Sequence, residues 1–496
     1  MAPLSLSSTR EAGVIPSDAF AQKIPATEQR WFAESFVDPN GRVFEWRGDI
    51  YRAVEPAFAL RWEEWERNGT IAALVHDGLL IESELTRFTT ESGQAVLRHR
   101  RVPVASYCYE WAPPMLKAAA LTTIELCIRL AEKGLTLQDG HPWNVLFEGT
   151  EPVYIDAGSI VPARADILWA PYQQFCNFFL FPLYLYAAGR DHIASWLLRD
   201  YLAGVTDEDV LAVLPFSFRL RHPRRALGVA VPKWLGKLFE RLPEEMQQRF
   251  LSISQKVNGC PTNIKLRIKF LESVRKDVES LRLGGARSHW ARYYGTTDES
   301  YFNTDLSPGD WQRKQEVVSE ILARLRAASV LDVGANTGHY ARLAARNGAR
   351  VIASETDVSA LTLCCERARK ERLNILPLAV NVFSVSPTPG RGGGALPAPA
   401  ERFRSELVMG LAVIHHVVAV QRMTITRISE IFAALTTRWL LLEFAAPLKP
   451  KMGASPVQGL DDYTVSDLED CLKKYFVSVH CFPSYPDDRK LFLCEK

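Results

Sequence analysis

The sequence predicts an α/β protein, with an open, doubly wound sheet in the C-terminal half and a separate α+β domain in the N-terminal half. A glycine-rich turn at 334–338 joins an apolar run to a helical pattern, which is typical of the first strand-turn-helix unit of such a sheet. Apolar runs then alternate with helical patterns to the end of the chain. The 496 residues exceed what one hydrophobic core usually holds, so roughly two or three domains are expected.

The C-terminal half contains seven apolar runs that are interpreted as strands. Helical patterns at 358–372, 424–437 and 464–475 separate several of them. Strands that alternate with helices form a parallel sheet covered on both faces. The last two runs are joined by turn residues at 486–488 and should close one edge of the sheet as a hairpin. In order, the runs are VLDV, RVIASE, NILPLAV, LVMGLAVI, RWLLLEFA, FVSVHCF and KLFLCEK.

The glycine turn reads D-x-G-x-x-x-G, with Asp332, Gly334 and Gly338, and Glu355 follows 21 residues after Gly334. Glycine permits the sharp turn and the close approach of a ligand that a Cβ would block. A carboxylate at this distance, after the second strand, can accept hydrogen bonds from both ribose hydroxyls. A G-x-G-x-x-G frame would need glycine where Asn336 stands, so a nucleoside without a pyrophosphate is favoured.

These residues resemble the S-adenosylmethionine (SAM) site of class I methyltransferases, whose seven-stranded sheet also ends in a hairpin. The resemblance implies that Glu355 binds the ribose, with Asp357 as the alternative, and that Asn381 after strand three accepts from the adenine amino group. An ordinary strand-to-helix turn with a surface glutamate is the competing interpretation. The cofactor-binding residues implied are Asp332, Gly334, Asn336, Gly338, Glu355, Asp357 and Asn381.

Candidate catalytic residues lie at the ends of predicted strands four and five. His415 and His416 stand at the edge that faces the methyl group in this fold, where a neutral imidazole could take a proton from a hydroxyl, phenol or amine. Alternatively, they shape the pocket or cap the next helix. Glu443 interrupts an apolar run, and a carboxylate there must face a cleft or a partner. No N/D-P-P-Y sequence follows strand four, which disfavours amide or base N-methylation of that kind.

A second motif, LQDGHPWNVLF, places Asp139 five residues before Asn144, and Asp156 ends the next apolar strand. An Asp-x4-Asn loop followed by a strand and Asp-x-Gly is how the protein-kinase fold places a catalytic base and two metal-binding groups. The order D-x-H-P-x-N resembles the aminoglycoside-phosphotransferase branch of that fold. A predicted hairpin at 41–54 and predicted helices at 56–67 and 115–133 agree with this interpretation, while a loop with this spacing by chance is the alternative.

The kinase-like motif departs from the family pattern in three ways. Leu137 stands where a histidine belongs, no G-x-G-x-x-G loop occurs, and the nearest basic residue on the third strand is Arg52 in place of a lysine. Because neutralising the phosphates is most of what such a site does, ATP with Mg is disfavoured as a ligand. Binding or presenting a substrate is the expected role of this module.

Composition restricts the remaining functions. The net charge is +2, but residues 216–292 contain 17 Lys and Arg against 6 Asp and Glu, which predicts a solvated basic helical bridge suited to an anionic substrate. Sparse aromatic residues there disfavour nucleic acid. Nine cysteines without a C-x-x-C pair indicate neither disulfides nor a metal site, and they favour the cytoplasm. The apolar run 175–188 is too short to span a bilayer and is expected to be a buried helix.

Taken together, YEWAPPMLKAAALT, the D-x-H-P-W-N loop, YQQFCNFFLFPL, LDVGANTG and LAVIHH resemble the nodulation-protein-type SAM methyltransferases over most of residues 35–496. The expected function is methyl transfer from SAM to a small-molecule or saccharide-like acceptor. A bifunctional kinase-methyltransferase and an inactive binding protein are the alternatives. The expected parts are a flexible arm (1–30), a kinase-like domain (31–215), the basic bridge (216–289) and a methyltransferase domain (290–496).

Overall fold

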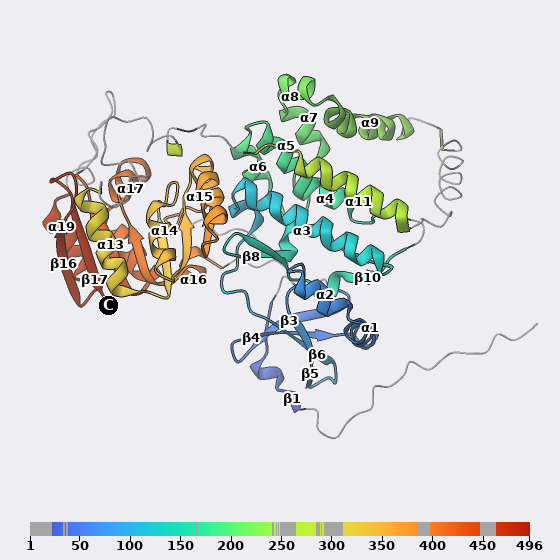
Figure 1. Ribbon diagram of the computed structural model, residues 1–496, viewed down its shortest axis with the longest axis horizontal. Coiled ribbons are helices and arrows are strands. Elements are labelled where there is room, and N and C mark those ends of the chain that lie inside the picture. The colour runs from blue at the N-terminus through green and yellow to red at the C-terminus, as the bar shows by residue number, and fades with distance from the viewer. Residues whose placement is uncertain are drawn as a thin grey trace, which may run out of the picture. The chain divides into compact units, whose positions relative to one another are not determined.

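The structure is a computed structural model (Figure 1), and contacts between residues divide its chain into two compact units. One unit is Met1–Arg101 with Ala157–Ser159, and the other is Val102–Asp156 with Ile160–Lys496. The four-part division predicted from the sequence stays a prediction. The residues that the structure describes are 22–32, 35, 38–164, 167–240, 243–244, 246, 248, 264–283, 288, 290–291, 311–384, 397–446 and 463–496.

The first unit contains a six-stranded sheet with the order β1-β5-β6-β4-β3-β2. The predicted hairpin is confirmed as β3 and β4, and the predicted helix at 56–67 is confirmed as α1. Residues 22–24 of the predicted arm form β1, which pairs in parallel with β5, whereas 1–21 lie outside the described residues. The elements are β1 (Gln22–Ile24), β2 (Arg30–Trp31), β3 (Gly41–Trp46), β4 (Asp49–Val54), α1 (Pro56–Arg67), α2 (Thr70–His76), β5 (Ser83–Thr90) and β6 (Ala95–His99).

The second unit begins with helix α3 (Pro113–Glu132), which leads into the D-x-H-P-x-N loop as predicted. Two short hairpin-like pairs follow it, β7 with β10 and β8 with β9. The predicted buried helix at 175–188 is confirmed, and its middle turn is π-helical. These elements are β7 (Leu135–Leu137), β8 (Val145–Glu148), β9 (Glu151–Tyr154), β10 (Ile160–Pro162), α4 (Tyr172–Phe175), the π-helical turn Cys176–Leu180 and α5 (Phe181–Ala187).

The basic segment is helical where it is described; Lys265, Lys269 and Lys276 are exposed as predicted, whereas Arg267 is buried. Helix α11 (Ile264–Glu279) packs along α3, with Leu271 and Val278 buried between them. Arg267, only 5% exposed, donates to the backbone carbonyls of Leu168 and Ile167, so this charge is internal rather than displayed to a ligand. The other described helices between residues 191 and 240 are α6 (Asp191–Leu197), α7 (Asp207–Val213), α8 (Phe216–Arg221) and α9 (Pro223–Glu240).

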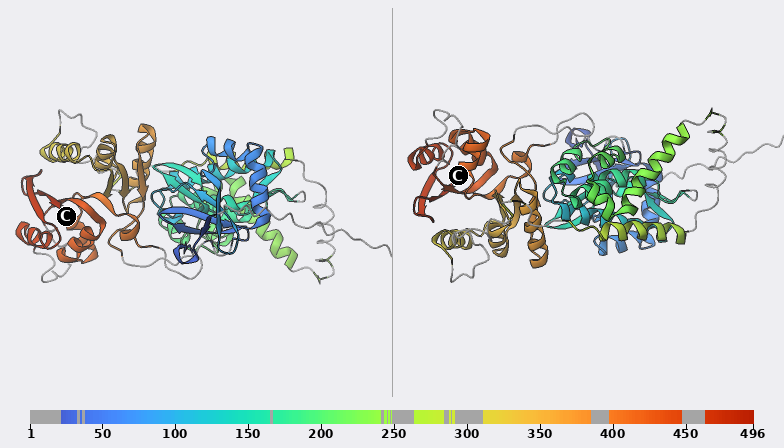
Figure 2. Two further views of the ribbon diagram at one scale, coloured as in Figure 1. Left: turned by 90° about the horizontal axis from the view of Figure 1, so that it is seen from below. Right: turned by 90° about the horizontal axis from the view of Figure 1, so that it is seen from above.

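A seven-stranded sheet, with the order β13-β12-β11-β14-β15-β17-β16, forms the C-terminal part of the second unit. β11 to β15 run parallel, and β17 pairs antiparallel with both β15 and β16, which confirms the predicted sheet and its closing hairpin. The last strands of this sheet are coloured red in Figure 2. The strands are β11 (Ser329–Val333), β12 (Arg350–Ser354), β13 (Ile375–Leu378), β14 (Ser405–Gly410), β15 (Thr436–Phe444), β16 (Ser478–Pro483) and β17 (Lys490–Glu495).

Helices flank this sheet, and buried apolar side chains form the core between them. Val318 and Ala341 pack with Val330 and Val351 in a cluster that joins two helices to the central strands. None of the described helices has both the length and the apolar character that a bilayer crossing requires. The helices are α13 (Arg313–Leu325), α14 (His339–Arg346), α15 (Val358–Glu371), α16 (Pro399–Arg402), α17 (Ile414–Gln421), α18 (Ile425–Leu435) and α19 (Val465–Leu472).

The predicted end of strand four is wrong, and the predicted loop at 384–400 lies mostly outside the described residues. Strand four was predicted through Ile414, which is wrong, because β14 ends at Gly410 and α17 begins at Ile414. Ala412 adopts a left-handed backbone conformation (φ 56°), which ends the extended run although its apolar character continues. Most of the Pro- and Gly-rich loop predicted at 384–400 lies outside the described residues.

Candidate functional site

A cavity of about 360 Å³ lies at the carboxyl ends of β11, β12 and β14. The order of strands reverses between β11 and β14, and ligands of open α/β sheets bind at such a reversal. Gly338, Asp357 and Glu443 do not line the cavity. The sequence-predicted residues that do line it are Asp332, Gly334, Asn336, Glu355, Asn381, His415 and His416.

Both glycines of the turn are required by backbone shape and by packing. Gly334 has φ 73°, and a Cβ there would collide with the side chain of Val413, which also lines the cavity. Gly338 has φ 84° and precedes α14, and its Cβ would collide with the thiol of Cys364. Gly334 therefore shapes the cavity wall directly, while Gly338 allows the helix to pack on α15.

Glu355 is fixed at the end of β12 by three backbone N–H donors. Its carboxylate accepts from Asn336 at 2.9 Å, from Thr356 at 2.6 Å and from Asp357 at 2.9 Å. Burial raises the pKa of the Glu355 carboxyl above its usual value, and the N–H donors act in the opposite direction. Asp357 instead caps α15 by accepting from the Ala360 N–H at 2.8 Å.

Asp332 is the penultimate residue of β11 and is 2% exposed. Its Oδ2 has no hydrogen-bond partner among the described residues, and the same holds for Oδ1 of Asn336. Burial raises the pKa of Asp332 to about 7, the approach of Glu355 adds to this, and Lys314 opposes it. Two acceptors without partners thus belong to the cavity wall, which suits a ligand that carries hydrogen-bond donors.

Asn381, in the loop after β13, is already hydrogen-bonded at both ends of its amide. Its nitrogen donates to Gln421 Oε1 at 3.1 Å, and its oxygen accepts from the Phe383 N–H at 3.0 Å. A carbonyl oxygen has a second lone pair, so a further donor could still bind there.

His415 and His416 form the first turn of α17, with ring centroids 4.2 Å apart. Burial lowers the pKa of His415 to about 3, and the neighbouring His416 contributes. Burial also lowers the pKa of His416, and the positive charge of Arg489 lowers it further. Both imidazoles are therefore neutral near pH 7. The ring of Trp290 meets that of His416 edge-on at 5.1 Å and lines the same cavity.

Glu443 on β15 is completely buried and has partners. Its carboxylate accepts from Lys314 Nζ at 2.6 Å and from the Ser484 hydroxyl at 2.9 Å, and Arg489 lies 3.8 Å away. Lys314 and Arg489 line the cavity, so Glu443 holds two cations at its wall. A carboxylate inside an apolar strand indicated that such partners exist, but no signal in the sequence identifies which residues they are.

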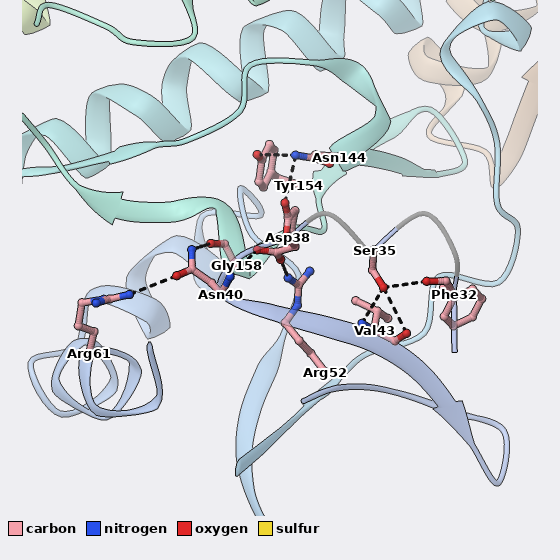
Figure 3. A network of polar contacts seen from close by, with 11 residues as sticks. Phe32, Ser35, Asp38, Asn40, Val43, Arg52, Arg61, Asn144, Tyr154 and Gly158 are labelled. Carbon is pink, nitrogen blue, oxygen red and sulfur yellow. Dashed lines mark hydrogen bonds and ion pairs between the residues drawn. The ribbon is translucent and has the colours of Figure 1, made fainter. Parts of the chain in front are cut away.

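The kinase-like motif residues also come together. The Asn144 amide donates to the Tyr154 hydroxyl at 3.1 Å (Figure 3) and to Asp156 Oδ2 at 3.2 Å. The Tyr154 hydroxyl donates to the Asp139 carbonyl at 3.4 Å. Asn144 and Asp156 are thus in direct contact, and Tyr154 links Asn144 to the backbone of Asp139. Among the described residues, no group of three or more His, Cys, Asp or Glu side chains is placed to hold a metal ion.

Arg52, on β4, forms a buried ion pair with Asp38 (Figure 3). Asn40 of the same loop donates to the Gly158 carbonyl at 2.7 Å. A Cβ at Gly158 would collide with the Arg52 guanidinium, so the glycine of Asp-x-Gly makes room for this ion pair. The charge of Arg52 is therefore neutralised within its own unit.

Comparison with known proteins gives one relative of substantial similarity. No protein-family model matches the chain. The chain is similar to the nodulation protein NoeA of Rhizobium meliloti (strain 1021), with 30% identity over 397 residues that cover 77% of this chain and 78% of the relative.

Similarity to solved structures is more remote. Monomeric WbdD shares 18% identity and a TM-score of 0.27 over 38% of this chain and 42% of that one. Magnesium protoporphyrin IX methyltransferase (ChlM) from Synechocystis PCC 6803 with bound SAM shares 17% identity and a TM-score of 0.29 over 42% of this chain and 89% of that one. The chain spans about two fifths of WbdD, and neither likeness carries a functional conclusion.

Proposed function

The chain belongs to the family of the nodulation protein NoeA, and from this premise we propose that it is a cytosolic SAM-dependent methyltransferase. Its acceptor is a small molecule or a saccharide-like compound. The observation that supports this most is the cavity at the strand reversal, where Glu355 is fixed by three N–H donors beside the unpartnered acceptor of Asp332.

The residues of the cavity fit SAM in charge and in hydrogen bonding. The cofactor's ammonium group would donate to Asp332 Oδ2, which has no other partner among the described residues. A cation at this place stabilises the ionised form of the Asp332 carboxyl. Lys314, whose charge acts on Asp332, suits the carboxylate of the same amino-acid group. Glu355 would accept from the ribose hydroxyls and Asn381 from the adenine amino group. When bound, SAM supplies an electrophilic methyl group at its sulfonium.

The proton released by the acceptor is assigned to His416. A general base works best when its pKa lies near the working pH, and a pKa of about 3 makes His415 a weak base. His416 is less buried than its neighbour and lies against Trp290, at the same cavity. His415 supports it by packing, with ring centroids 4.2 Å apart.

Arg489 favours an acceptor that carries negative charge. Burial lowers the pKa of both histidines, and the positive charge of the Arg489 guanidinium lowers it further. Arg489 therefore acts near the imidazole that accepts the proton of the acceptor. Glu443 lies 3.8 Å from Arg489 and also binds Lys314, so both cations are held at the same wall of the cavity. A phosphate or carboxylate on the acceptor would suit the positive charge of this wall. In-line placement of the acceptor against the sulfonium supplies much of the rate.

The kinase-like module binds or presents the acceptor in this proposal. Asp139, Asn144 and Asp156 keep the sequence spacing that suits a base and two metal contacts, which is the observation in favour of a bifunctional enzyme. Against phosphotransfer stand the absence of a G-x-G-x-x-G loop in the sequence and the ion pair that neutralises Arg52. Phosphate binding needs positive charge free to act on the phosphates.

Calorimetric titration of the full chain with SAM, and separately with ATP and Mg²⁺, distinguishes the methyltransferase, the bifunctional enzyme and the inactive binding protein. Binding of SAM alone supports a methyltransferase with a non-phosphorylating module. Binding of both supports the bifunctional enzyme. Absence of SAM binding would overturn the proposal and leave the inactive binding protein.

A further inference from the structure

We propose that a segment of the N-terminal module, Tyr107–Trp111, positions the adenine side of the cofactor cavity, with Glu110 as the positioning residue. This inference rests on the proposed function, because the adenine side is defined by SAM. All residues involved belong to the second compact unit.

The segment pairs with the end of an edge strand. Trp111 forms an isolated antiparallel bridge with Leu378, the last residue of β13, and the Ala379 N–H donates to the Glu110 carbonyl at 2.6 Å. β13 is the outermost strand of the seven-stranded sheet, so its far edge has no neighbouring strand within that sheet. Residues 110 and 111 cover that edge where the strand ends.

The Glu110 side chain joins this strand end to the start of β14. Its carboxylate accepts from Arg402 Nη1 at 2.9 Å and Nη2 at 2.5 Å, in a two-pronged ion pair with both side chains nearly fully buried. It also accepts from the Tyr107 N–H at 2.9 Å. Arg402 ends α16, three residues before β14 begins, and its guanidinium lies over the Tyr107 ring at 4.6 Å.

The residues that this arrangement holds lead directly into the cavity. Val380 and Asn381 follow Ala379 and line the cavity wall. The Val380 carbonyl accepts from the Ser354 hydroxyl at 2.7 Å, and the Glu355 N–H donates to the Leu378 carbonyl at 3.0 Å. The end of β13 is therefore held by β12 on one side and by Glu110 on the other. A shift at Glu110 would move the loop that carries Asn381.

The same segment contacts the kinase-like loop. The rings of Tyr107 and Tyr109 lie 5.7 Å and 6.1 Å from that of Trp143, which belongs to the D-x-H-P-W-N motif. A packed chain of side chains thus runs from the motif loop to Glu110 and on to the cavity wall. Such contiguous contacts give acceptor binding at the module a physical route to alter cofactor binding.

The test compares full-length variants by calorimetry with SAM and with 5′-methylthioadenosine, which keeps the adenosine part and lacks the amino acid. Glu110→Gln should weaken both ligands by a similar factor, roughly 10-fold. The pH dependence of SAM binding, which reports Asp332 on the amino-acid side, should keep its midpoint. A general structural defect would also disturb the amino-acid side of the cavity and would therefore shift this midpoint.

Glu371→Gln is the matched control, because Glu371 pairs with Arg342 and Arg346 and does not line the cavity. It should leave both affinities unchanged. If Glu110→Gln alone fails to fold, Glu110→Gln/Arg402→Met removes both buried charges and should fold with the same loss of affinity.

Wild-type affinity in the Glu110 variants, or weaker SAM binding with unchanged 5′-methylthioadenosine binding, would overturn the inference. Failure of the wild-type chain to bind SAM would instead overturn the proposed function itself.

Discussion

Asp332→Asn should weaken SAM binding and, at the same time, stabilise the unliganded protein near neutral pH. The carboxyl is 2% exposed, and burial raises its pKa from the ordinary 3.8 to about 7. At about 1.36 kcal/mol per pKa unit, the folded state loses roughly 4 kcal/mol when this group ionises. Asparagine never ionises and escapes this loss, although its buried amide costs about 1–3 kcal/mol if its donors stay unpaired.

The sign of the pH dependence follows from the direction of the shift. Because the folded-state pKa is raised, the protonated Asp332 contributes stability below pH 4 that is lost as the pH rises through about 7. The stability advantage of the variant should therefore grow by about 2 kcal/mol between pH 5 and pH 7.5, however well the amide packs. Thermal midpoints of the ligand-free proteins measure this, at roughly 2–4 °C per kcal/mol.

Binding should move in the opposite direction. A hydrogen bond between charged groups contributes about 1.5–3 kcal/mol, so the variant should bind SAM roughly 10- to 150-fold more weakly at pH 7.5. Wild-type affinity should rise from pH 5.5 to 7.5 as Asp332 ionises, and the variant should show no such rise. Higher pH is avoided because an α-amino group itself loses its proton at a pKa of about 7.7–8.0.

Asp467→Asn is the charge-matched control, since Asp467 caps α19 and does not line the cavity. Equal SAM affinity of wild type and the Asp332 variant across this range would refute the ammonium contact. A stability difference that stays constant from pH 5 to 7.5 would refute the raised pKa.

Three further predictions concern the rest of the site. Glu355→Ala removes a charge-assisted acceptor and should weaken SAM by about 1.5–3 kcal/mol in calorimetry, whereas unchanged affinity would exclude the ribose contact. His416→Asn should lower turnover roughly 10²–10⁴-fold with little change in SAM affinity, and an equal loss of SAM affinity would mark it as a pocket-shaping residue. Full-length protein should transfer no labelled phosphate from ATP with Mg²⁺. Transfer that Asp139→Ala abolishes would support the bifunctional alternative.

The sequence predicted the seven strands because each is a short apolar run bounded by turn residues or helical patterns. It did not predict where strand four ends, because Ile414 continues the apolar run and nothing in the residue types reports the left-handed Ala412. The glycine turn was predictable because glycine adopts positive φ at little cost, and both Gly334 and Gly338 do so. Local geometry is thus encoded locally, except where tertiary packing imposes an unusual backbone.

The cations of the cavity could not be predicted in the same way. Glu443 and Lys314 are separated by 129 residues, and only the sheet brings β15 beside α13. A buried carboxylate requires a partner, so the existence of a cation followed from Glu443 alone. Its identity depends on which helix packs at the carboxyl end of the sheet.

The stretch YEWAPPM shows how a sequence motif can act outside its own module. Glu110, Trp111 and the prolines of this stretch lie outside the D-x-H-P-W-N loop, yet they belong to the sequence pattern by which the chain resembles nodulation-protein-type methyltransferases. In the structure, Trp111 bridges Leu378 and Glu110 binds Arg402, 292 residues further along the chain. A prediction that treats the two halves separately cannot find such contacts. Under our proposal, this stretch acts where the end of β13 lies against it, because Glu110 there positions the loop that carries Asn381.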